Sequence, residues 1–322
     1  MIARLTRLMI LFQLATLILI TVLLKQLEVL ESWPLAVIAA ALLLTVLRAS
    51  IIFNNFFLSR ALRQPCANGQ QPGTSSSLAM MLQEFWFSMR CWFRLFPFAQ
   101  PYAHHVDTDI SCPVVLLHGY GANSGFWQQF HHRLQSQGIS HCAINLEPVL
   151  GSIDEYAPRI EAAVREMLAE HPAHHKAHQV IVVAHSMGGL AARAWLRRCG
   201  MQSVARVITL GTPHAGSLLA GYGIGINARQ MLPASAWRAE EKHWLSELAA
   251  SEDAAVRALF LSVWSRHDNI VVPQISAELP GADHVAFDEI GHVALGFDKR
   301  VVDLVMEEIN AVRRSRPSAG HR

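Results

Sequence analysis

The sequence predicts an α/β fold, a mostly parallel sheet covered by helices on both faces, preceded by a hairpin of two apolar helices. From Pro113 onward, short apolar runs of strand length alternate with longer amphipathic runs. Before residue 60, two long runs are almost free of charge. The 322 residues are 52% hydrophobic and 16% charged, which is more apolar than a typical soluble domain. This excess is concentrated in the two N-terminal runs.

The first apolar run, Leu8 to Leu24, contains no charged residue. At about 1.5 Å per helical residue, it comes close to crossing a hydrocarbon core of about 30 Å. The second run, Trp33 to Leu47, reaches that length only if the helix continues through Arg48 to Phe53 and the arginine extends toward the headgroups. A cleaved signal peptide is the alternative for the first run, but no small-residue cleavage site follows it. Residues 1–59 are therefore expected to form a two-helix membrane anchor.

Residues 60–112 are expected to connect this anchor to the sheet. Residues 60–77 are rich in Gln, Gly, Pro and Ser, which is typical of an irregular linker. The stretch from Leu78 to Phe98 then contains seven Phe and Trp residues, and its only charged residues are Glu84, Arg90 and Arg94. Two interpretations stay open for it: a helix buried against the following domain, or a helix in the membrane interface, where aromatic side chains concentrate.

Residues 113–322 carry the alternating pattern and are expected to form one domain. Strands are predicted at 113–119, 141–148, 179–185, 205–213, 259–264 and 285–290. Helices are predicted at 124–137, 153–170, 299–313 and directly after Ser186. In open parallel sheets, ligands bind at the carboxyl ends of the strands. Polar residues that follow these strands are therefore the candidates for a functional site.

Residues 180–195 read VIVVAHSMGGLAARAW, a strand and a helix separated by a glycine-rich turn with Ser186 at its tip. This arrangement is typical of a nucleophile elbow, whose usual pattern is G-x-S-x-G. Ala184 stands in place of the first glycine. A plain glycine-rich turn is the alternative interpretation.

Two further polar groups follow later strands. Asp268 comes after the strand 259–264, and His292 comes after the strand 285–290. An imidazole can take the proton of a serine hydroxyl, and a buried carboxylate can hold that imidazole in the correct tautomer. The chain order Ser186, Asp268, His292 predicts a catalytic triad. Acyl transfer also needs donors for an oxyanion, and the backbone N–H groups of Tyr120 and Met187 are the candidates.

Several segments together resemble the bacterial lipases and esterases of the α/β-hydrolase fold. They are HGYGANSGFW (118–127), AHSMGGL (184–190), LGTPHAGS (210–217), SRHDNIVVP (265–273) and GHVALG (291–296). The resemblance covers roughly residues 113–312 and implies ester hydrolysis on acyl substrates. It also implies that the T-P-H-x-G element borders the acyl site. The candidates for lining the substrate pocket are His118, His185, His214, Leu218 and Tyr222.

Between residues 217 and 251 the strand–helix alternation stops, and this fold commonly inserts a cap there. Apolar residues of this segment could line an acyl pocket, or they could form one face of an ordinary crossover helix. We expect a cap at 217–251.

The net charge, the histidine spacing and the motifs of the sequence give no reason to expect nucleic acid, a metal ion or a cofactor as a partner. The net charge of +2 at pH 7 gives no reason to expect nucleic-acid binding. Four histidines in HPAHHKAH (171–178) have near-helical spacing but no carboxylate or cysteine beside them, so a solvated connection is preferred to a metal site. No dinucleotide or phosphate-binding motif is present in the sequence, and no cofactor or metal is expected.

We therefore expect a membrane-anchored serine hydrolase that acts on a lipid or other acyl ester at the bilayer. A thioesterase or acyltransferase with the same triad, and a non-catalytic membrane scaffold, remain as alternatives. Five widely spaced cysteines suit a reducing compartment. Arginines flank both outer ends of the hairpin, whereas its loop has no excess of positive charge, so the domain is expected on the cytoplasmic side of a bacterial inner membrane.

Overall fold

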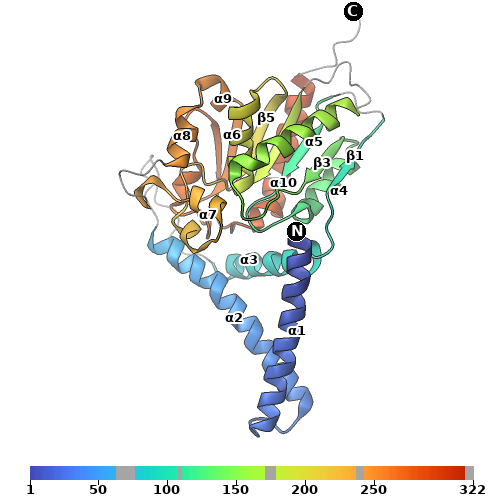
Figure 1. Ribbon diagram of the computed structural model, residues 1–322, viewed down its shortest axis with the longest axis vertical. Helices are drawn as coiled ribbons and strands as arrows, with labels where there is room; N and C mark the ends of the chain where they lie inside the picture. The colour runs from blue at the N-terminus through green and yellow to red at the C-terminus, as the bar shows by residue number, and fades with distance from the viewer. Residues whose placement is uncertain (63–76, 108–110, 171–178, 237–242, 316–322) are drawn as a thin grey trace, which may run out of the picture.

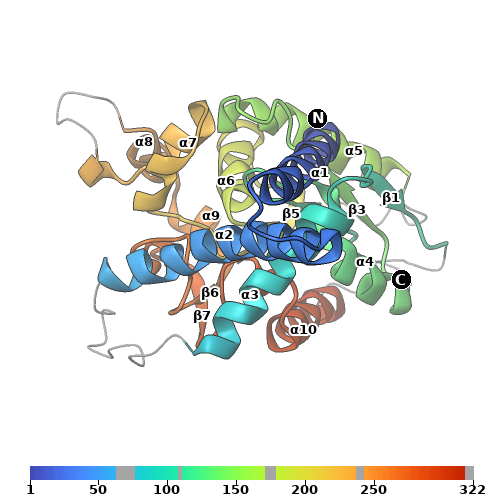
Figure 2. The ribbon, with the colours of Figure 1, turned by 90° about the horizontal axis from the view of Figure 1, so that it is seen from below.

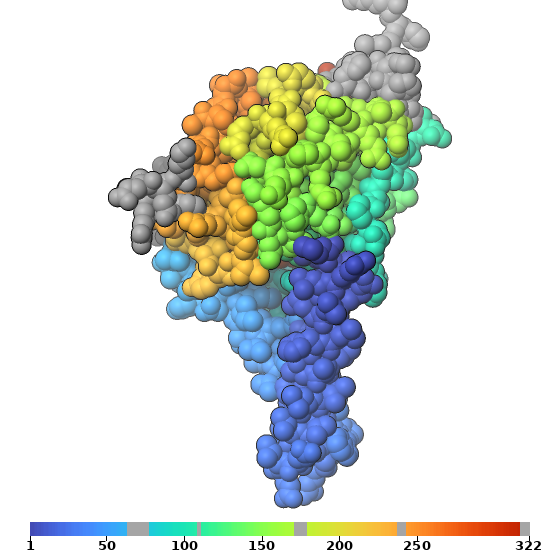
Figure 3. All heavy atoms as spheres, viewed as in Figure 1, coloured from blue at the N-terminus to red at the C-terminus, as the bar shows by residue number. Residues whose placement is uncertain are grey.

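The computed structural model describes residues 1–62, 77–107, 111–170, 179–236 and 243–315. A rounded body contains the sheet and its helices, and two long helices project from one end of it (Figures 1 and 3). This confirms the expected fold class. The predicted linker falls largely outside the described residues, as do the histidine cluster 171–178, Cys66 and Trp237.

Within the described residues, the sheet has seven strands in the order β1-β3-β2-β4-β5-β6-β7. All neighbouring pairs are parallel except β1 and β3. The strands are β1 (Tyr102–His104), β2 (Val114–Leu117), β3 (His141–Ile144), β4 (Val180–His185), β5 (Val204–Leu210), β6 (Phe260–Ser265) and β7 (Asp283–Phe287).

Six of these strands were expected from the sequence, with differences at their ends. The predicted strand 285–290 corresponds to β7, which begins two residues earlier, at Asp283, and ends three residues earlier, at Phe287. The pairing stops at Phe287 because its partner in β6 is Ser265, the last residue of that strand, and Glu289 two residues later has a positive φ of 59°. The three-residue edge strand β1 was not predicted.

Helices cover both faces of the sheet, and each face has its own apolar cluster. One cluster includes side chains of α4 (Gln128–Ser136) and α10 (Lys299–Ser315). The other includes side chains of α5 (Ala157–Ala169), α6 (Met187–Cys199) and α8 (Trp244–Ala250). The shorter helices are α7 (Ile226–Gln230) and α9 (Ala254–Ala258), and 3₁₀ turns at Ser124–Trp127 and Ile153–Tyr156 precede α4 and α5.

The two projecting helices are α1 (Ile2–Gln26) and α2 (Trp33–Ala61). Both are long and apolar enough to cross a membrane, and few of their side chains are buried. α2 continues without a break past Arg48, whose guanidinium lies 5.0 Å from the centre of the Phe93 ring. The far end of α2 packs on the body, where Phe56 and Ser59 are buried.

The aromatic-rich stretch forms α3 (Leu78–Arg90) and a π-helical turn, Cys91–Leu95. α3 lies across the end of the body from which α1 and α2 project (Figures 1 and 2). One face of α3 is buried and includes Met80, Glu84 and Ser88. The opposite face is exposed and apolar, with Leu82 and Trp86. The buried face agrees with a helix packed against the body, and the membrane-interface position of the exposed face stays a prediction.

The carboxyl edge of the sheet faces this anchor region. The side-chain amide of Asn123, in the loop after β2, donates to the carbonyl of Phe96 at 2.8 Å. Ser124 donates to the carbonyl of Gln100 at 2.8 Å. Gln274, in the segment after β6, donates to the carbonyl of Ser59 near the end of α2. The loops that follow the strands are thus in contact with the end of α2 and with the segment that follows the hairpin.

Candidate active site

Ser186 lies at the sharp turn between β4 and α6, where its backbone has φ 54° and ψ −127°. Positive φ is costly for a residue with a side chain, and such strain is typical of functional turns. Hydrogen bonds hold the turn on both sides. The Ser186 N–H donates to the carbonyl of Leu210 at 2.8 Å. The Ser186 carbonyl accepts from the Thr212 hydroxyl at 2.8 Å and from the Gly189 N–H at 3.0 Å.

Small residues around this turn are required by close packing. A Cβ at Gly119 would lie 2.8 Å from the Cβ of Ser186. A Cβ at Gly188 would lie 2.5 Å from the carbonyl oxygen of Leu117. Ala184, the departure from the usual pattern, lies inside β4, where its methyl group is fully buried in an apolar cluster. The methyl is therefore accommodated by the sheet rather than by the turn.

Asp268 and His292 meet behind this turn. His292 Nδ1 and Asp268 Oδ2 are 2.8 Å apart, and both side chains are buried. The other carboxylate oxygen of Asp268 accepts the N–H groups of Ile270 and Val271, each at 2.8 Å. Because a carboxylate only accepts, His292 carries a proton on Nδ1 and leaves Nε2 available as a base.

The ring of His292 lies close to the end of β5, whose last residue, Leu210, accepts the Ser186 N–H. A Cβ at Gly211, the residue after Leu210, would lie 3.2 Å from His292 Nδ1 and 3.1 Å from Asp268 Oδ2. Gly211 has a φ of 56°, so glycine is needed there for conformation as well as for space. The Ser186 hydroxyl forms no hydrogen bond to a described residue. Such contacts often tighten only when substrate is bound.

Burial alone would lower the pKa of His292, because it disfavours the imidazolium ion. The charge of Asp268, its hydrogen bond and the charge of Glu84 act in the opposite direction. Together they raise the pKa of His292 above its ordinary value of 6.5. The histidine is therefore a stronger base than an isolated imidazole.

The two candidate oxyanion donors are arranged differently. Met187 is the first residue of α6, where a backbone N–H has no acceptor within the helix. The Tyr120 N–H donates to no acceptor among the described residues. The phenol of Tyr120 donates to the carbonyl of Ile224 at 2.8 Å and accepts the Ile224 N–H at 3.0 Å. The loop carrying Tyr120 is thereby fastened to the predicted cap.

His118 braces this loop. Its Nε2 accepts the N–H of Leu146 at 2.9 Å, so the proton is on Nδ1, which lies 2.9 Å from the carbonyl of Gly119. Burial lowers the pKa of His118 to about 4, and the imidazole is neutral at neutral pH. Both ring nitrogens are used within the protein, which leaves neither of them for a substrate.

The other pocket candidates occupy varied positions. His185 is buried beside His292, with ring centres 4.7 Å apart, and its Nε2 donates to the His292 carbonyl at 3.0 Å. His214 is buried, and its Nε2 lies 3.2 Å from the Thr209 hydroxyl. Burial of each ring lowers the pKa of both imidazoles, so both are neutral. Leu218 is half-buried, whereas Tyr222 is 79% exposed on the outer surface.

The segment predicted as a cap contains a 3₁₀ turn, Leu218–Tyr222, followed by α7 and α8. Its first residues are attached to the segment after Asp268, because the Leu218 N–H donates to the carbonyl of Val272 at 2.8 Å. Three large apolar residues at its tip are exposed: Tyr222, Ile224 and Ile226.

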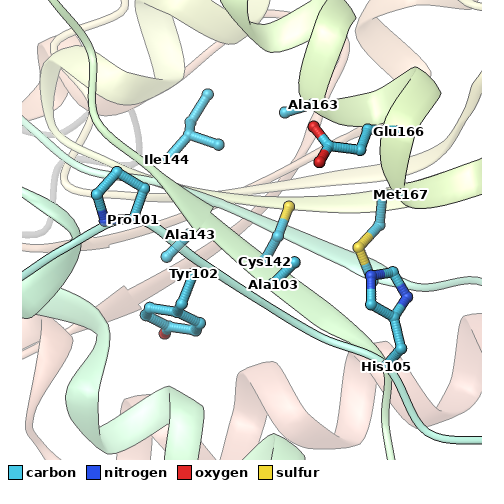
Figure 4. A pocket seen from close by; sticks show the side chains of 10 residues that line it. All are labelled: Pro101, Tyr102, Ala103, His105, Cys142, Ala143, Ile144, Ala163, Glu166 and Met167. Carbon is cyan, nitrogen blue, oxygen red and sulfur yellow. The ribbon is translucent and has the colours of Figure 1, made fainter. Parts of the chain in front are cut away.

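A cavity of about 210 Å³ lies elsewhere, at the β1 edge of the sheet (Figure 4). Pro101 and Tyr102 line it from the chain around β1, Cys142 from β3, and Glu166 and Met167 from α5. None of the predicted catalytic residues lines this cavity. Within the described part of the chain, no group of three His, Cys, Asp or Glu side chains is placed to hold a metal ion.

Sequence reasoning missed one residue at the site. Glu84 of α3 is buried, and its two carboxylate oxygens accept the N–H groups of Val293 and Ala294, directly after His292. The available signal was a lone acidic residue in the aromatic stretch 78–98.

Parts of the chain are similar to lipases and to a thioesterase family. Residues 113–251 match the family model described as palmitoyl protein thioesterase. The chain is 30% identical over 105 residues to triacylglycerol lipase 2 of Saccharomyces cerevisiae, covering 31% of each chain. It is 32% identical over 137 residues to a triacylglycerol lipase of Burkholderia plantarii, covering 38% of this chain and 36% of that one. The chain thus spans about a third of the length of these relatives.

The solved structure of a Bacillus licheniformis lipase in its mature form superposes with a TM-score of 0.53 at 18% identity, covering 65% of this chain and 97% of the other. That of Aspergillus fumigatus lipase B superposes with a TM-score of 0.50 at 15% identity, covering 65% and 56%. The parallel sheet and the helices around it therefore have the α/β-hydrolase fold.

Proposed function

We propose that this protein is a membrane-anchored serine hydrolase that cleaves carboxylic esters, with Ser186 as nucleophile, His292 as base and Asp268 as the residue that orients the base. The observation that carries the proposal is the 2.8 Å contact between His292 and Asp268 beside the strained turn of Ser186. The partial matches to triacylglycerol lipases favour a lipid ester as substrate.

The reaction follows from these positions. His292 Nε2 takes the proton of Ser186 as its oxygen attacks the ester carbonyl, and the N–H groups of Tyr120 and Met187 stabilise the oxyanion. The imidazolium, held by Asp268, then donates its proton to the leaving alcohol. Water repeats the sequence and releases the carboxylic acid from Ser186.

A thioesterase is the second candidate, because residues 113–251 match the palmitoyl protein thioesterase family model. The same groups would act on a thioester. Rates on an oxyester and a thioester of the same acyl group distinguish the two. The third candidate function is that of a non-catalytic scaffold with a hydrolase fold. A fluorophosphonate probe would not label such a scaffold at Ser186.

We expect Ser186→Ala and His292→Ala each to reduce kcat on p-nitrophenyl esters by at least about 10⁴-fold, because the triad acts as a unit. Ser186→Ala should also abolish fluorophosphonate labelling. His267→Ala is the matched control, since its Nδ1 accepts the N–H of Glu289 rather than contacting Asp268. Wild-type turnover in either triad variant, or equal loss in His267→Ala, would contradict the assignment.

The pH dependence of kcat/KM should report His292. The free enzyme needs neutral His292, and the pKa of this residue is raised. Activity on a soluble ester should therefore fall as the pH drops through that pKa, with the midpoint of the acid limb above 6.5. A midpoint clearly below 6.5 would mean that the charges near His292 do not act on the base.

The apolar face of α3 is proposed to lie in the membrane interface, close to the substrate. Its support is the exposure of Leu82 and Trp86 in α3 and of Phe93 in the π-helical turn that follows it. α3 lies at the end of the body where the hairpin emerges (Figure 2). The exposed cap tip adds to it, because α7 lies at the same end (Figure 1). The anchor region would then keep the carboxyl edge of the sheet beside acyl chains.

Replacing Leu82, Trp86 and Phe93 by serine should lower activity on esters presented in vesicles several-fold more than activity on a soluble short-chain ester. The expected reason is lost contact with the bilayer. Phe87→Ser is the control, because Phe87 stacks on Phe297 of the body at 4.8 Å and should affect both substrates alike. Equal losses in the triple variant would exclude the interfacial role.

We propose that both α1 and α2 cross the inner membrane, so that both tails are cytoplasmic. Arg4 and Arg7 lie in the first turns of α1 and Arg60 lies in the last turn of α2, which fits the excess of positive charge on the cytoplasmic side. The unbroken course of α2 past Arg48 supports a second crossing.

A reporter fused after Arg322 tests this topology. A cytoplasmic fluorescent protein should be bright there, and alkaline phosphatase should be inactive. Active phosphatase with a dark fluorescent fusion would mean that only one helix crosses and that the hydrolase domain lies outside.

A further inference from the structure

A buried carboxylate from α3 contacts the loop that carries His292. The side chain of Glu84 is 1% exposed. Its Oε1 accepts the Val293 N–H and its Oε2 accepts the Ala294 N–H, each at 2.8 Å. On the other side of the histidine, a Cβ at Gly291 would lie 2.5 Å from Oε2. Glu84 is therefore packed against residues on both sides of His292.

His292 and the residues after it are consequently contacted by three side chains from two elements, the loop after β6 and α3. Asp268 contacts its ring, and the side-chain oxygen of Asn269 accepts its backbone N–H at 2.9 Å. Glu84 accepts the next two N–H groups of the same loop. Hydrogen bonds to a charged carboxylate are stronger than neutral ones, and burial excludes water as a substitute acceptor. Of the three, only Glu84 comes from outside the sheet and its loops.

We propose that Glu84 is a positioning residue of the active site: it fixes the His292 loop from α3 and, when ionised, favours the protonated imidazole during the reaction. The inference rests on the proposed hydrolase function. This proposal gives α3 two roles. Its exposed face carries Leu82 and Trp86, and its buried face fixes the position of the loop that contains His292.

Opposing effects place the pKa of Glu84 near neutral pH. Burial and, to a smaller extent, the charge of Asp268 raise its pKa, whereas the N–H groups of Val293 and Ala294 and the charge of His292 lower it, and the net pKa is about 7. In return, Glu84 raises the pKa of His292. On its own helical segment the facing group is the Cys91 thiol, whose pKa is raised by burial and by Glu84.

Two substitutions separate the charge from the hydrogen bonds. Glu84→Gln keeps the volume but removes the charge, and its NH₂ group cannot accept from one of the two amides. We expect kcat to fall roughly tenfold with little change in KM, and the acid limb of kcat/KM to move to lower pH. Glu84→Asp keeps the charge but is one methylene shorter. We expect a similar fall in kcat with the acid limb close to its wild-type position.

The experiment uses the full chain in detergent micelles, p-nitrophenyl butyrate as the probe substrate and rates per site titrated with a fluorophosphonate. A purely structural role would reduce the number of titrated sites without altering the rate per site or the acid limb. Ser88→Ala, one turn further along the buried face of α3, is the matched control and should retain the wild-type profile.

Wild-type kcat and an unmoved acid limb in Glu84→Gln would overturn the proposal, and so would an equal fall in Ser88→Ala. If Glu84→Gln does not accumulate in a folded form, Glu84→Asp decides, because unchanged kcat there would overturn it equally. The two proposals fail separately. Full turnover in Ser186→Ala rejects the hydrolase itself, whereas loss in Ser186→Ala with a wild-type Glu84→Gln rejects only the role of Glu84.

Discussion

The carboxyl edge of the sheet is organised around the backbone of Ser186, which is held at a positive φ that costs about 1–3 kcal/mol for a residue with a side chain. The cost is met by hydrogen bonds to Leu210 and from Thr212, and by packing so close that only glycine fits at 119 and 188. Because Gly211 follows Leu210 directly, the segment that fixes the serine also borders Asp268 and His292.

The sheet could be predicted because parallel strands are buried on both faces and appear in the sequence as continuous apolar runs. Val180–His185 is buried at every position, and Val114–Leu117 likewise. The edge strand Tyr102–His104 has neither an apolar run nor a clear alternation, and among the described strands it pairs with β3 alone. Such a strand is specified by its neighbour rather than by its own residues, so the sequence contained no signal for it.

The candidate site was predictable to the extent that topology brings residues together. Ser186, Asp268 and His292 each follow a parallel strand, so a common edge collects them. Glu84 lies 209 residues before the amide it contacts and is outside the sheet. Its position depends on where α3 docks, which no periodicity encodes. The structural role of His118 could not be predicted from the sequence either. Its two ring hydrogen bonds depend on the position of Leu146 and on the path of its own loop.

The paired bonds between the Tyr120 phenol and Ile224 join two loops that are 104 residues apart in the sequence. The phenol both donates to and accepts from the backbone of the same residue, so the position of the Tyr120 loop depends on the position of Ile224. A substitution that displaces Ile224 would therefore also be felt at the backbone of the loop after β2, although the two segments share no secondary-structure element.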